Sequence, residues 1–234
     1  MRGWPLEGGL ADIKAAKEND PAARNKFEIW LTYSGVHALS WYRVAHFFYK
    51  IKLKLLARII SQTARFFTGI EIHPAAKIAG GVFIDHGAGV VIGETAEVEK
   101  GVVIYQGATL GGPGKERGKR HPTVKRGAII SAGARVLGGF TVGEYAKIGA
   151  NAVVLREVPP YATVVGVPAH VVRINGEKPA DLEQEKGDPL QEELCNLQSR
   201  VYELQKQIDS LSAENGKGGK NGKRVKSGEN KDEK

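Results

Sequence analysis

The spacing of apolar residues changes twice along the chain. From residue 7 to residue 68, apolar side chains recur at steps of three and four, which is the period of an amphipathic α-helix. From residue 70 onward they recur every six residues, a period that neither a helix nor an ordinary strand produces alone. The pattern predicts an α+β protein, with an all-helical domain over residues 1–69 and a repeat domain over residues 70–175.

The six-residue period is typical of a parallel β-helix. Each hexad supplies one short strand and a turn, and three hexads complete a triangular coil with the apolar marker of each hexad pointing inward. Markers of successive coils stack about 4.8 Å apart. Their positions are Ile72, Ile78, Ile84, Val90, Ile92, Val98, Ile104, Leu110, Val124, Ile130, Val136, Val142, Ile148 and Val154. The phase resets by two residues after Val90.

A second register supports the first. Four residues after a marker stands a side chain, small in most cases, that suits the crowded corner of a coil. These positions are Ala76, Val82, Ala88, Ala96, Val102, Ala108, Ala128, Ala134, Phe140, Ala146, Ala152 and Val158. Glycine is frequent between them and tolerates the positive φ of such turns.

The repeat is interrupted between Leu110 and Val124. The step of fourteen residues is two more than two hexads, and the segment GGPGKERGKRHPT offers no apolar residue to point inward. A loop over residues 111–123 is therefore expected to leave the coils. Its cationic side chains favour a functional loop over a tolerated insertion.

Glycines and prolines mark the expected ends of elements. Gly35 and Gly69 are expected to break the helical domain. Pro159, Pro160 and Pro168 are expected to stop strand propagation and end the β-helix.

Beyond a linker over residues 176–189, steps of four and three return. Leu194, Val201 and Ile208 occupy one heptad position, and the other is leucine throughout, at 190, 197, 204 and 211. This predicts a coiled-coil helix over residues 190–213. The composition favours a two-stranded coil, although a larger body can set another symmetry, and in either case we expect an oligomer.

The net charge of +8 is unevenly spread. Residues 215–234 carry seven Lys or Arg against three Asp or Glu and have almost no apolar residue. This predicts a disordered basic tail over residues 214–234 that serves solubility, or binds an acidic partner weakly, rather than a specific nucleic-acid site.

Composition limits the compartment. Cys195 is the single cysteine, which excludes an internal disulfide framework and fits a reducing environment. The most apolar stretch, residues 41–67, carries six Lys or Arg and so lacks an uncharged membrane span. The chain opens without the apolar core of a signal peptide. We expect a cytoplasmic protein with no membrane partner.

Two motifs carry a family resemblance. The runs GIEIHPAAKIAGGVFIDHGAGVVIGETA (69–96) and GATLGGPGKERGKRHPTVKRGA (107–128) resemble serine O-acetyltransferases, short bacterial-type members of the hexapeptide-repeat acyltransferases. The resemblance covers roughly residues 18–173. It implies a left-handed β-helix and direct acetyl transfer from acetyl-CoA to L-serine without an acyl-enzyme. O-Acetylserine, on the way to cysteine, would be the product, cysteine a competing inhibitor, and acetyl-CoA a co-substrate rather than a resident cofactor.

The resemblance also implies site residues. His86 matches the general base, and Glu71 matches the carboxylate that orients it, with one methylene more than the aspartate of many longer members. Asp20 and Asp85 match residues that recognise the serine ammonium group, and Arg120 and His121 match residues near its carboxylate. Such sites lie between subunits of a trimer. The residues expected along the coenzyme A groove are Gly112, Ala132, Lys147 and Ala150.

Other functions remain open at this point. An acetyltransferase for homoserine, a sugar or an antibiotic would keep the β-helix and His86 but would not need Asp20 or the Arg120–His121 pair. A metal-dependent hydratase of the γ-carbonic-anhydrase type needs three convergent histidines, which the spacing here does not offer, so no metal is expected. A non-catalytic trimeric scaffold is the third alternative.

The C-terminal sequence bears on partners. Family members that dock into O-acetylserine sulfhydrylase typically end in isoleucine, whereas this chain ends Lys231-Asp232-Glu233-Lys234. That docking is therefore not expected in its usual form. The short helical domain favours a homotrimer, with a hexamer as the alternative.

Overall fold

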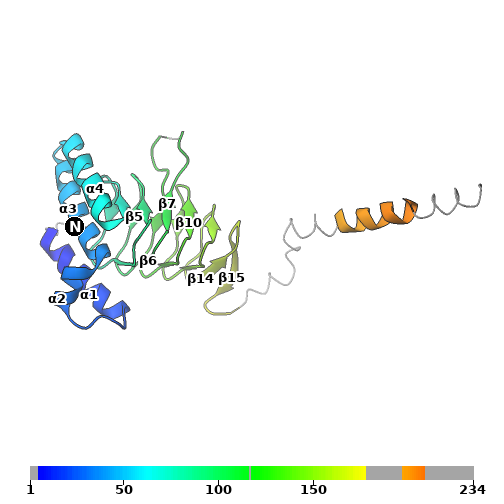
Figure 1. Cartoon of the computed structure of the whole chain (residues 1–234), viewed down its shortest axis with the longest axis horizontal. Helices are drawn as coiled ribbons and strands as arrows, with labels where there is room; N and C mark the ends of the chain where they lie inside the picture. The colour runs from blue at the N-terminus through cyan, green and yellow to red at the C-terminus, as the bar shows by residue number, and fades with distance from the viewer. Residues whose placement is uncertain (1–4, 116, 178–196, 209–234) are drawn as a thin grey trace, which may run out of the picture. The chain divides into compact units, whose positions relative to one another are not determined.

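The computed structural model describes residues 5–115, 117–177 and 197–208. The chain divides into two compact units, residues 1–182 and 183–234. The first unit begins with helices and continues as a stack of short strands (Figure 1). The helices are α1 (Pro5–Asn19), α2 (Lys26–Thr32), α3 (Ser34–Lys50) and α4 (Lys54–Thr68).

Successive strands pass through three sheets in turn. The strands are β1 (Glu71–Ile72), β2 (Lys77–Ile78), β3 (Phe83–Asp85), β4 (Val91–Ile92), β5 (Glu97–Val98), β6 (Val103–Tyr105), β7 (Thr109–Gly111), β8 (Thr123–Val124), β9 (Ile129–Ile130), β10 (Arg135–Leu137), β11 (Thr141–Val142), β12 (Lys147–Ile148), β13 (Val153–Val154), β14 (Ala162–Val165) and β15 (His170–Ile174). Sheet A has the order β1-β4-β7-β10-β13, sheet B the order β11-β8-β5-β2, and sheet C the order β15-β14-β12-β9-β6-β3. Paired strands are parallel except β14 with β15, so the predicted parallel β-helix is confirmed.

The apolar markers build the interior of this β-helix. All of them are buried apart from Ile78, which is half-buried and packs against the same core. The corner positions are also buried, with Phe140 half-buried and Ala88 exposed as the exceptions. Close packing of branched side chains in successive coils therefore supplies the main apolar burial.

Val90 is a corner residue rather than a marker, which corrects the predicted register. Its carbonyl accepts the N–H of Glu71, just as the carbonyl of Ala108 accepts the N–H of Val91 one coil later. Phe83 pairs with Val103, a separation of 20 residues, whereas Val91 pairs with Thr109, a separation of 18. The two extra residues therefore lie in the turn 86–89, and this turn pushes Ala88 out to solvent.

The loop is also longer than its spacing indicated. Leu110 and Val124 belong to consecutive strands, β7 and β8, so one hexad lies between them and not two. Thr109 pairs with Arg135, 26 residues on, against 18 in a regular coil. The loop therefore adds eight residues to one hexad. Figure 1 shows it projecting away from the coils.

Of the two predicted helix breaks, Gly69 is confirmed and Gly35 is wrong. Gly69 ends α4 in the left-handed conformation, with φ of 71°. Gly35 lies in the first turn of α3, and the break falls instead at Tyr33. A Cβ on Gly35 would stand 2.1 Å from the carbonyl oxygen of Ile84, so the missing side chain lets α3 touch β3.

Helices α1, α2 and α3 pack on the outer face of sheet C at its β3–β6 end. Ala16, Ile29 and Val36 pack with Phe83 and Val103 of β3 and β6 in a second buried cluster.

A buried ion pair joins these helices to the coils. Asp12 of α1 pairs with Arg43 of α3 and accepts the N–H of Gly81 at 2.8 Å. Burial raises the pKa of Asp12 to about 6, against the opposing effects of Arg43 and of the backbone N–H donors. The pair therefore sets the position of α1, whose last residue precedes Asp20.

The β-helix continues past the first pair of prolines, contrary to the prediction. After Pro159 and Pro160, β14 still joins sheet C in parallel with β12. The chain then reverses through Gly166 and Pro168, and β15 returns antiparallel to β14. Proline removes only one backbone donor, and neither proline falls inside a strand.

The second unit is described over residues 197–208, which are helical. Leu197, Val201, Leu204 and Ile208 lie at heptad spacing on it and are exposed. The rest of the predicted coiled coil, most of the linker and the tail lie outside the described residues. None of the described helices is long and apolar enough to cross a membrane.

Candidate active site

His86 stands on the turn between sheet C and sheet A, immediately after β3. Its backbone has φ of 57°, in the left-handed region that is uncommon for residues other than glycine, and its side chain is 73% exposed. The Ser34 hydroxyl at the start of α3 donates to the His86 carbonyl at 3.3 Å. Because Ile84 is anchored in the core, the turn presents the imidazole outward.

The Asp85 carboxylate lies beside this imidazole, and the charge of the imidazole also acts on Asp20. Asp85 Oδ1 is 3.9 Å from His86 Nε2. Asp20, after α1, accepts the Tyr33 hydroxyl at 2.5 Å and the N–H of Ala22 at 2.7 Å.

The ionisation of Asp20 follows from these contacts. The Tyr33 hydrogen bond, then the Ala22 N–H and the charge of His86, hold the pKa of Asp20 below its usual value against a smaller opposing effect of burial. The same hydrogen bond is the main cause that raises the pKa of Tyr33 to about 12, so Tyr33 stays a donor. Asp20, Tyr33, Asp85 and His86 form the His86 group, an anionic setting suited to an ammonium ion.

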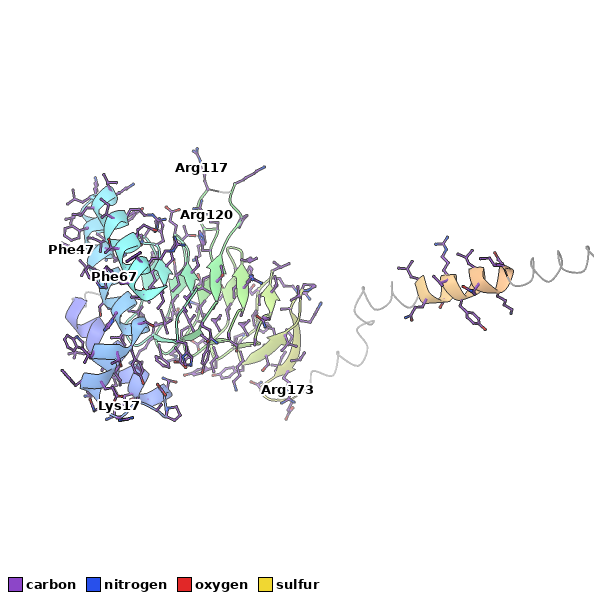
Figure 2. All side chains as sticks on the ribbon, in the orientation of Figure 1. Lys17, Phe47, Phe67, Arg117, Arg120 and Arg173 are labelled. Carbon is purple, nitrogen blue, oxygen red and sulfur yellow. The ribbon has the colours of Figure 1, made fainter. Side chains whose placement is uncertain are left out.

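A second set of predicted residues gathers at the corner between sheet A and sheet B. Arg120 pairs with Glu94 at 2.7 Å. His121 is only 8% exposed, and its Nδ1 lies 2.9 Å from Thr95 Oγ1 and 3.2 Å from the Thr95 nitrogen. Burial first, and then the charge of Arg120, lower the pKa of His121. Figure 2 shows Arg120 near the base of the projecting loop and Arg117 farther out.

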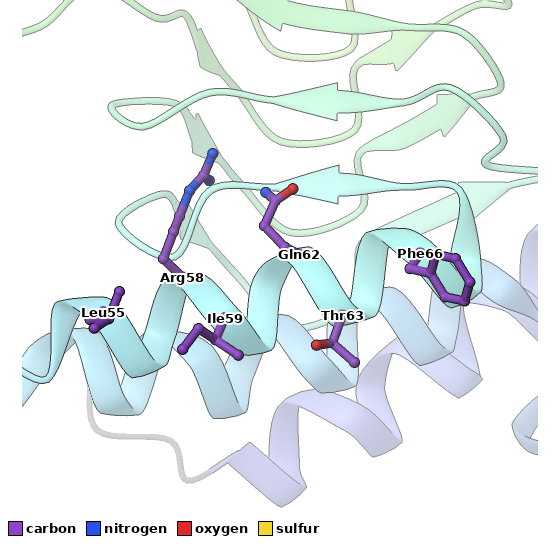
Figure 3. A pocket seen from close by; sticks show the side chains of 6 residues that line it. All are labelled: Leu55, Arg58, Ile59, Gln62, Thr63 and Phe66. Atoms are coloured by element: carbon purple, nitrogen blue, oxygen red, sulfur yellow. The ribbon is translucent and has the colours of Figure 1, made fainter.

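The Glu71 carboxylate is paired with α4 rather than with His86. Its two carboxylate oxygens face Arg58 at 3.4 Å and Arg65 at 3.3 Å, both from α4. Figure 3 shows Arg58 extending from α4 toward the strands. Glu71, Glu94 and His121 all act electrostatically on His73. Glu71, Glu94, Thr95, Arg120 and His121 form the Arg120 group. Within its own chain, the carboxylate beside His86 is that of Asp85, and the pairing of His86 with Glu71 stays a prediction.

The residues predicted to bind coenzyme A also lie in different parts of the β-helix. Ala132 and Ala150 lie on the corner that carries His86, because the turns stack through bonds from Gly107 N to Ala88 O, Gly133 N to Gln106 O and Asn151 N to Ala132 O, each 2.9 Å. Lys147 is exposed at the start of β12 in sheet C.

Gly112 lies at the other corner, at the base of the loop. A Cβ there would stand 1.9 Å from the Arg120 carbonyl oxygen, so this glycine allows the two ends of the loop to meet.

Sequence reasoning missed Tyr33, Thr95 and Glu94. Glu94 and Thr95 stand inside the quoted IGET run, where two polar residues follow a buried marker. Tyr33 gave no signal, because its partner Asp20 is thirteen residues away and meets it through the packing of α1 on α2. Among the described residues, no group of three or more His, Cys, Asp or Glu is arranged to hold a metal ion.

Comparison with known proteins decides the family. No protein-family model matches the chain. A curated relative named serine acetyltransferase, from Bacillus pumilus strain SAFR-032, is 55% identical over 203 residues, covering 86% of this chain and 94% of the relative. The chain belongs to the serine acetyltransferase family.

Solved structures of serine acetyltransferases agree with this assignment. One in complex with cysteine is 46% identical, with a TM-score of 0.70, and the match covers 72% of this chain and 70% of that one. One in complex with CoA is 43% identical, with a TM-score of 0.68, and the match covers 72% of this chain and 69% of that one.

Proposed function

We propose that this chain transfers the acetyl group of acetyl-CoA to the hydroxyl of L-serine, giving O-acetylserine and CoA. The observation that carries the proposal is the exposed His86 imidazole, 3.9 Å from the Asp85 carboxylate and close enough to Asp20 to lower its pKa. Membership of the serine acetyltransferase family, and structures of relatives with CoA and with cysteine, support it.

In this mechanism His86 acts as general base and then as general acid. A serine hydroxyl is a weak nucleophile at neutral pH, so the imidazole takes its proton as the oxygen attacks the thioester carbonyl. The tetrahedral intermediate collapses with cleavage of the carbon–sulfur bond. The CoA sulfur leaves and receives the proton from the imidazolium. No acyl-enzyme forms.

The two charges of serine need opposite partners. Asp20 and Asp85 take the ammonium group, for which the lowered pKa of Asp20 keeps a negative charge available. Arg120 and His121 take the carboxylate, the guanidinium by paired N–H donors. Cysteine differs from serine only by sulfur in place of oxygen and is proposed as a competing inhibitor.

A site between two chains would bring the His86 group and the Arg120 group together. The His86 imidazole and the Arg120–His121 pair lie at different corners of the β-helix, so a homotrimer that faces one corner with the other would complete the site. Glu71 of a neighbouring chain would then orient His86. The α4 face supports association, because Leu55, Ile59 and Phe66 are exposed around a shallow hollow (Figure 3).

Acetyl-CoA is proposed to lie along the corner that His86 shares with Ala132 and Ala150. Small side chains there let the pantetheine arm approach the backbone, and Lys147 on the adjoining face is proposed to meet a phosphate. We further propose a cytoplasmic trimer in which residues 190–213 form the coiled coil.

The test is a thiol-release assay with serine, homoserine and a simple sugar as competing acceptors. Serine is expected to be preferred, and equal turnover of a sugar would instead support an acetyltransferase for another hydroxyl. Light scattering on the same sample gives the mass of the assembly. Titration with cysteine should raise the KM for serine without changing kcat.

A further inference from the structure

The geometry points to Thr95 as a positioning residue that fixes the hydrogen-bonding state of His121 and the place of Arg120. The inference rests on the proposed function in one respect, namely that Arg120 and His121 receive the serine carboxylate. Thr95 itself is three residues beyond the marker Ile92 and belongs to the turn between β4 and β5.

Thr95 holds three consecutive loop residues. Its hydroxyl oxygen accepts the backbone N–H of Arg120 at 3.1 Å and that of His121 at 3.0 Å. Its carbonyl accepts the Lys119 ammonium at 2.8 Å. The C-terminal end of the loop is therefore held by the side-chain hydroxyl and the backbone carbonyl of Thr95.

The same residue determines which nitrogen of His121 carries the proton. The Thr95 N–H points at Nδ1 from 3.2 Å, so Nδ1 must be the acceptor and the proton of the neutral ring sits on Nε2. Because two N–H groups already donate to the Thr95 oxygen, its own hydrogen is directed to Nδ1 at 2.9 Å. If Nδ1 were protonated, its N–H would face two other donors, the Thr95 N–H and the Thr95 hydroxyl.

The ring has little freedom to leave this arrangement. A Cβ on Gly93 would lie 2.0 Å from Cδ2 and 2.1 Å from Nε2 of His121, so the imidazole packs directly on the glycine backbone. Burial disfavours the imidazolium as well and lowers the pKa of His121. His121 therefore offers a neutral Nε2–H donor, which suits a carboxylate already paired with Arg120.

Thr95→Val removes the hydroxyl and keeps both the shape and the backbone N–H. We expect the KM for serine to rise about tenfold while the KM for acetyl-CoA stays within about twofold, since the three hydrogen bonds of the hydroxyl are lost at one end of the site. Thr95→Ser should restore the wild-type KM. Thr141→Val, a threonine of β11 outside both groups, is the matched control and should change neither constant.

A second measurement does not depend on turnover. In protein labelled with ¹⁵N-histidine, His121 is assigned from the spectrum of His121→Gln. At neutral pH its Nδ1 should show the shift of an unprotonated nitrogen and its Nε2 that of a protonated one. In Thr95→Val the ring should titrate at higher pH, because one donor to Nδ1 is gone.

Three outcomes would overturn the inference. They are a wild-type His121 with its proton on Nδ1, a Thr95→Val enzyme with the wild-type KM for serine, and a Thr95→Ser enzyme as impaired as Thr95→Val. If the wild-type chain does not acetylate serine, the proposed function is wrong. The position of the proton on His121 can still be tested, because it is measured without substrate.

Discussion

His86 stands on an exposed turn with 73% of its side chain accessible, whereas His121 is 8% exposed and bound through Nδ1 to Thr95. An imidazole open to solvent and flanked by carboxylates can gain and lose a proton during a reaction. An imidazole with a backbone N–H fixed on one nitrogen cannot easily do so. In the proposed mechanism, His86 transfers the proton, the carboxylates of the His86 group bind the serine ammonium group, and the Arg120 group binds the serine carboxylate.

The largest expected effect separates the two histidines. His86→Ala should lower kcat by at least about 10²-fold, because the general base is lost. His121→Ala should chiefly raise the KM for serine. Steady-state kinetics with both substrates measures the difference.

His170→Ala, in β15 at the far end of the β-helix, is the control and should behave as wild type. Near-normal kcat in His86→Ala, with an unchanged assembly mass, would rule out the mechanism.

The next effect tests whether both groups hold the same substrate. Asp20→Asn and Arg120→Gln should each raise the KM for serine by roughly 10- to 100-fold, the value of a hydrogen bond to a charged group, and should hardly change the KM for acetyl-CoA. Tyr33→Phe should give a smaller rise, of about fivefold, because it removes one partner of Asp20. Equal changes in both KM values would count against the assignment.

The repeat domain shows what periodicity can predict. Inward positions of a β-helix must be apolar in every coil, so the markers other than Val90 and most corner residues were identified correctly from the sequence. The two extra residues were misplaced because Val90 is apolar, and it fits the marker and the corner register equally well. The loop was miscounted because a gap of fourteen residues does not say how many strands it spans.

The site was predictable only in part, for a related physical reason. Asp85 and His86 stand in a recognisable motif directly after the marker Ile84, and Arg120 and His121 stand in the motif of the inserted loop. The partners that fix their state come from packing: Tyr33 meets Asp20 through α1 and α2, and Arg58 and Arg65 meet Glu71 because α4 lies against the first coil. Contacts between the helices and the hexad coils cannot be read from the helical period or from the six-residue period.

A third prediction tests how the His86 group depends on the helices. Gly35→Ala forces a Cβ to within 2.1 Å of the Ile84 carbonyl oxygen, which must push α3 away from β3. We expect a loss of about 1–3 kcal/mol in the free energy of unfolding and a lower kcat/KM, since Tyr33 and Ser34 move with the helix. Denaturant unfolding and the thiol assay measure the two effects.

The matched control is Gly9→Ala in α1. Its Cβ would meet nothing within 4 Å, so alanine should be neutral or stabilise the helix by up to about 1 kcal/mol. A Gly35→Ala enzyme with wild-type stability would show that α3 does not fix the position of β3.

The smallest effect concerns the buried pair that sets α1. Burial raises the folded-state pKa of Asp12 to about 6, above the ordinary value of 3.8. The folded state therefore binds a proton before the unfolded state does, so the contribution of Asp12 to stability is fully present below pH 3.8 and is lost as pH rises through 6.

Relative to Asp12→Asn, which cannot titrate, the wild type should gain about 1 kcal/mol in the free energy of unfolding between pH 7 and pH 5. Denaturant unfolding of both proteins at the two pH values measures this gain. The Arg120 group contributes equally to the stability of both proteins and does not affect the difference between them. A difference that does not change with pH would show that Arg43 and the N–H of Gly81 outweigh the effect of burial on the pKa of Asp12.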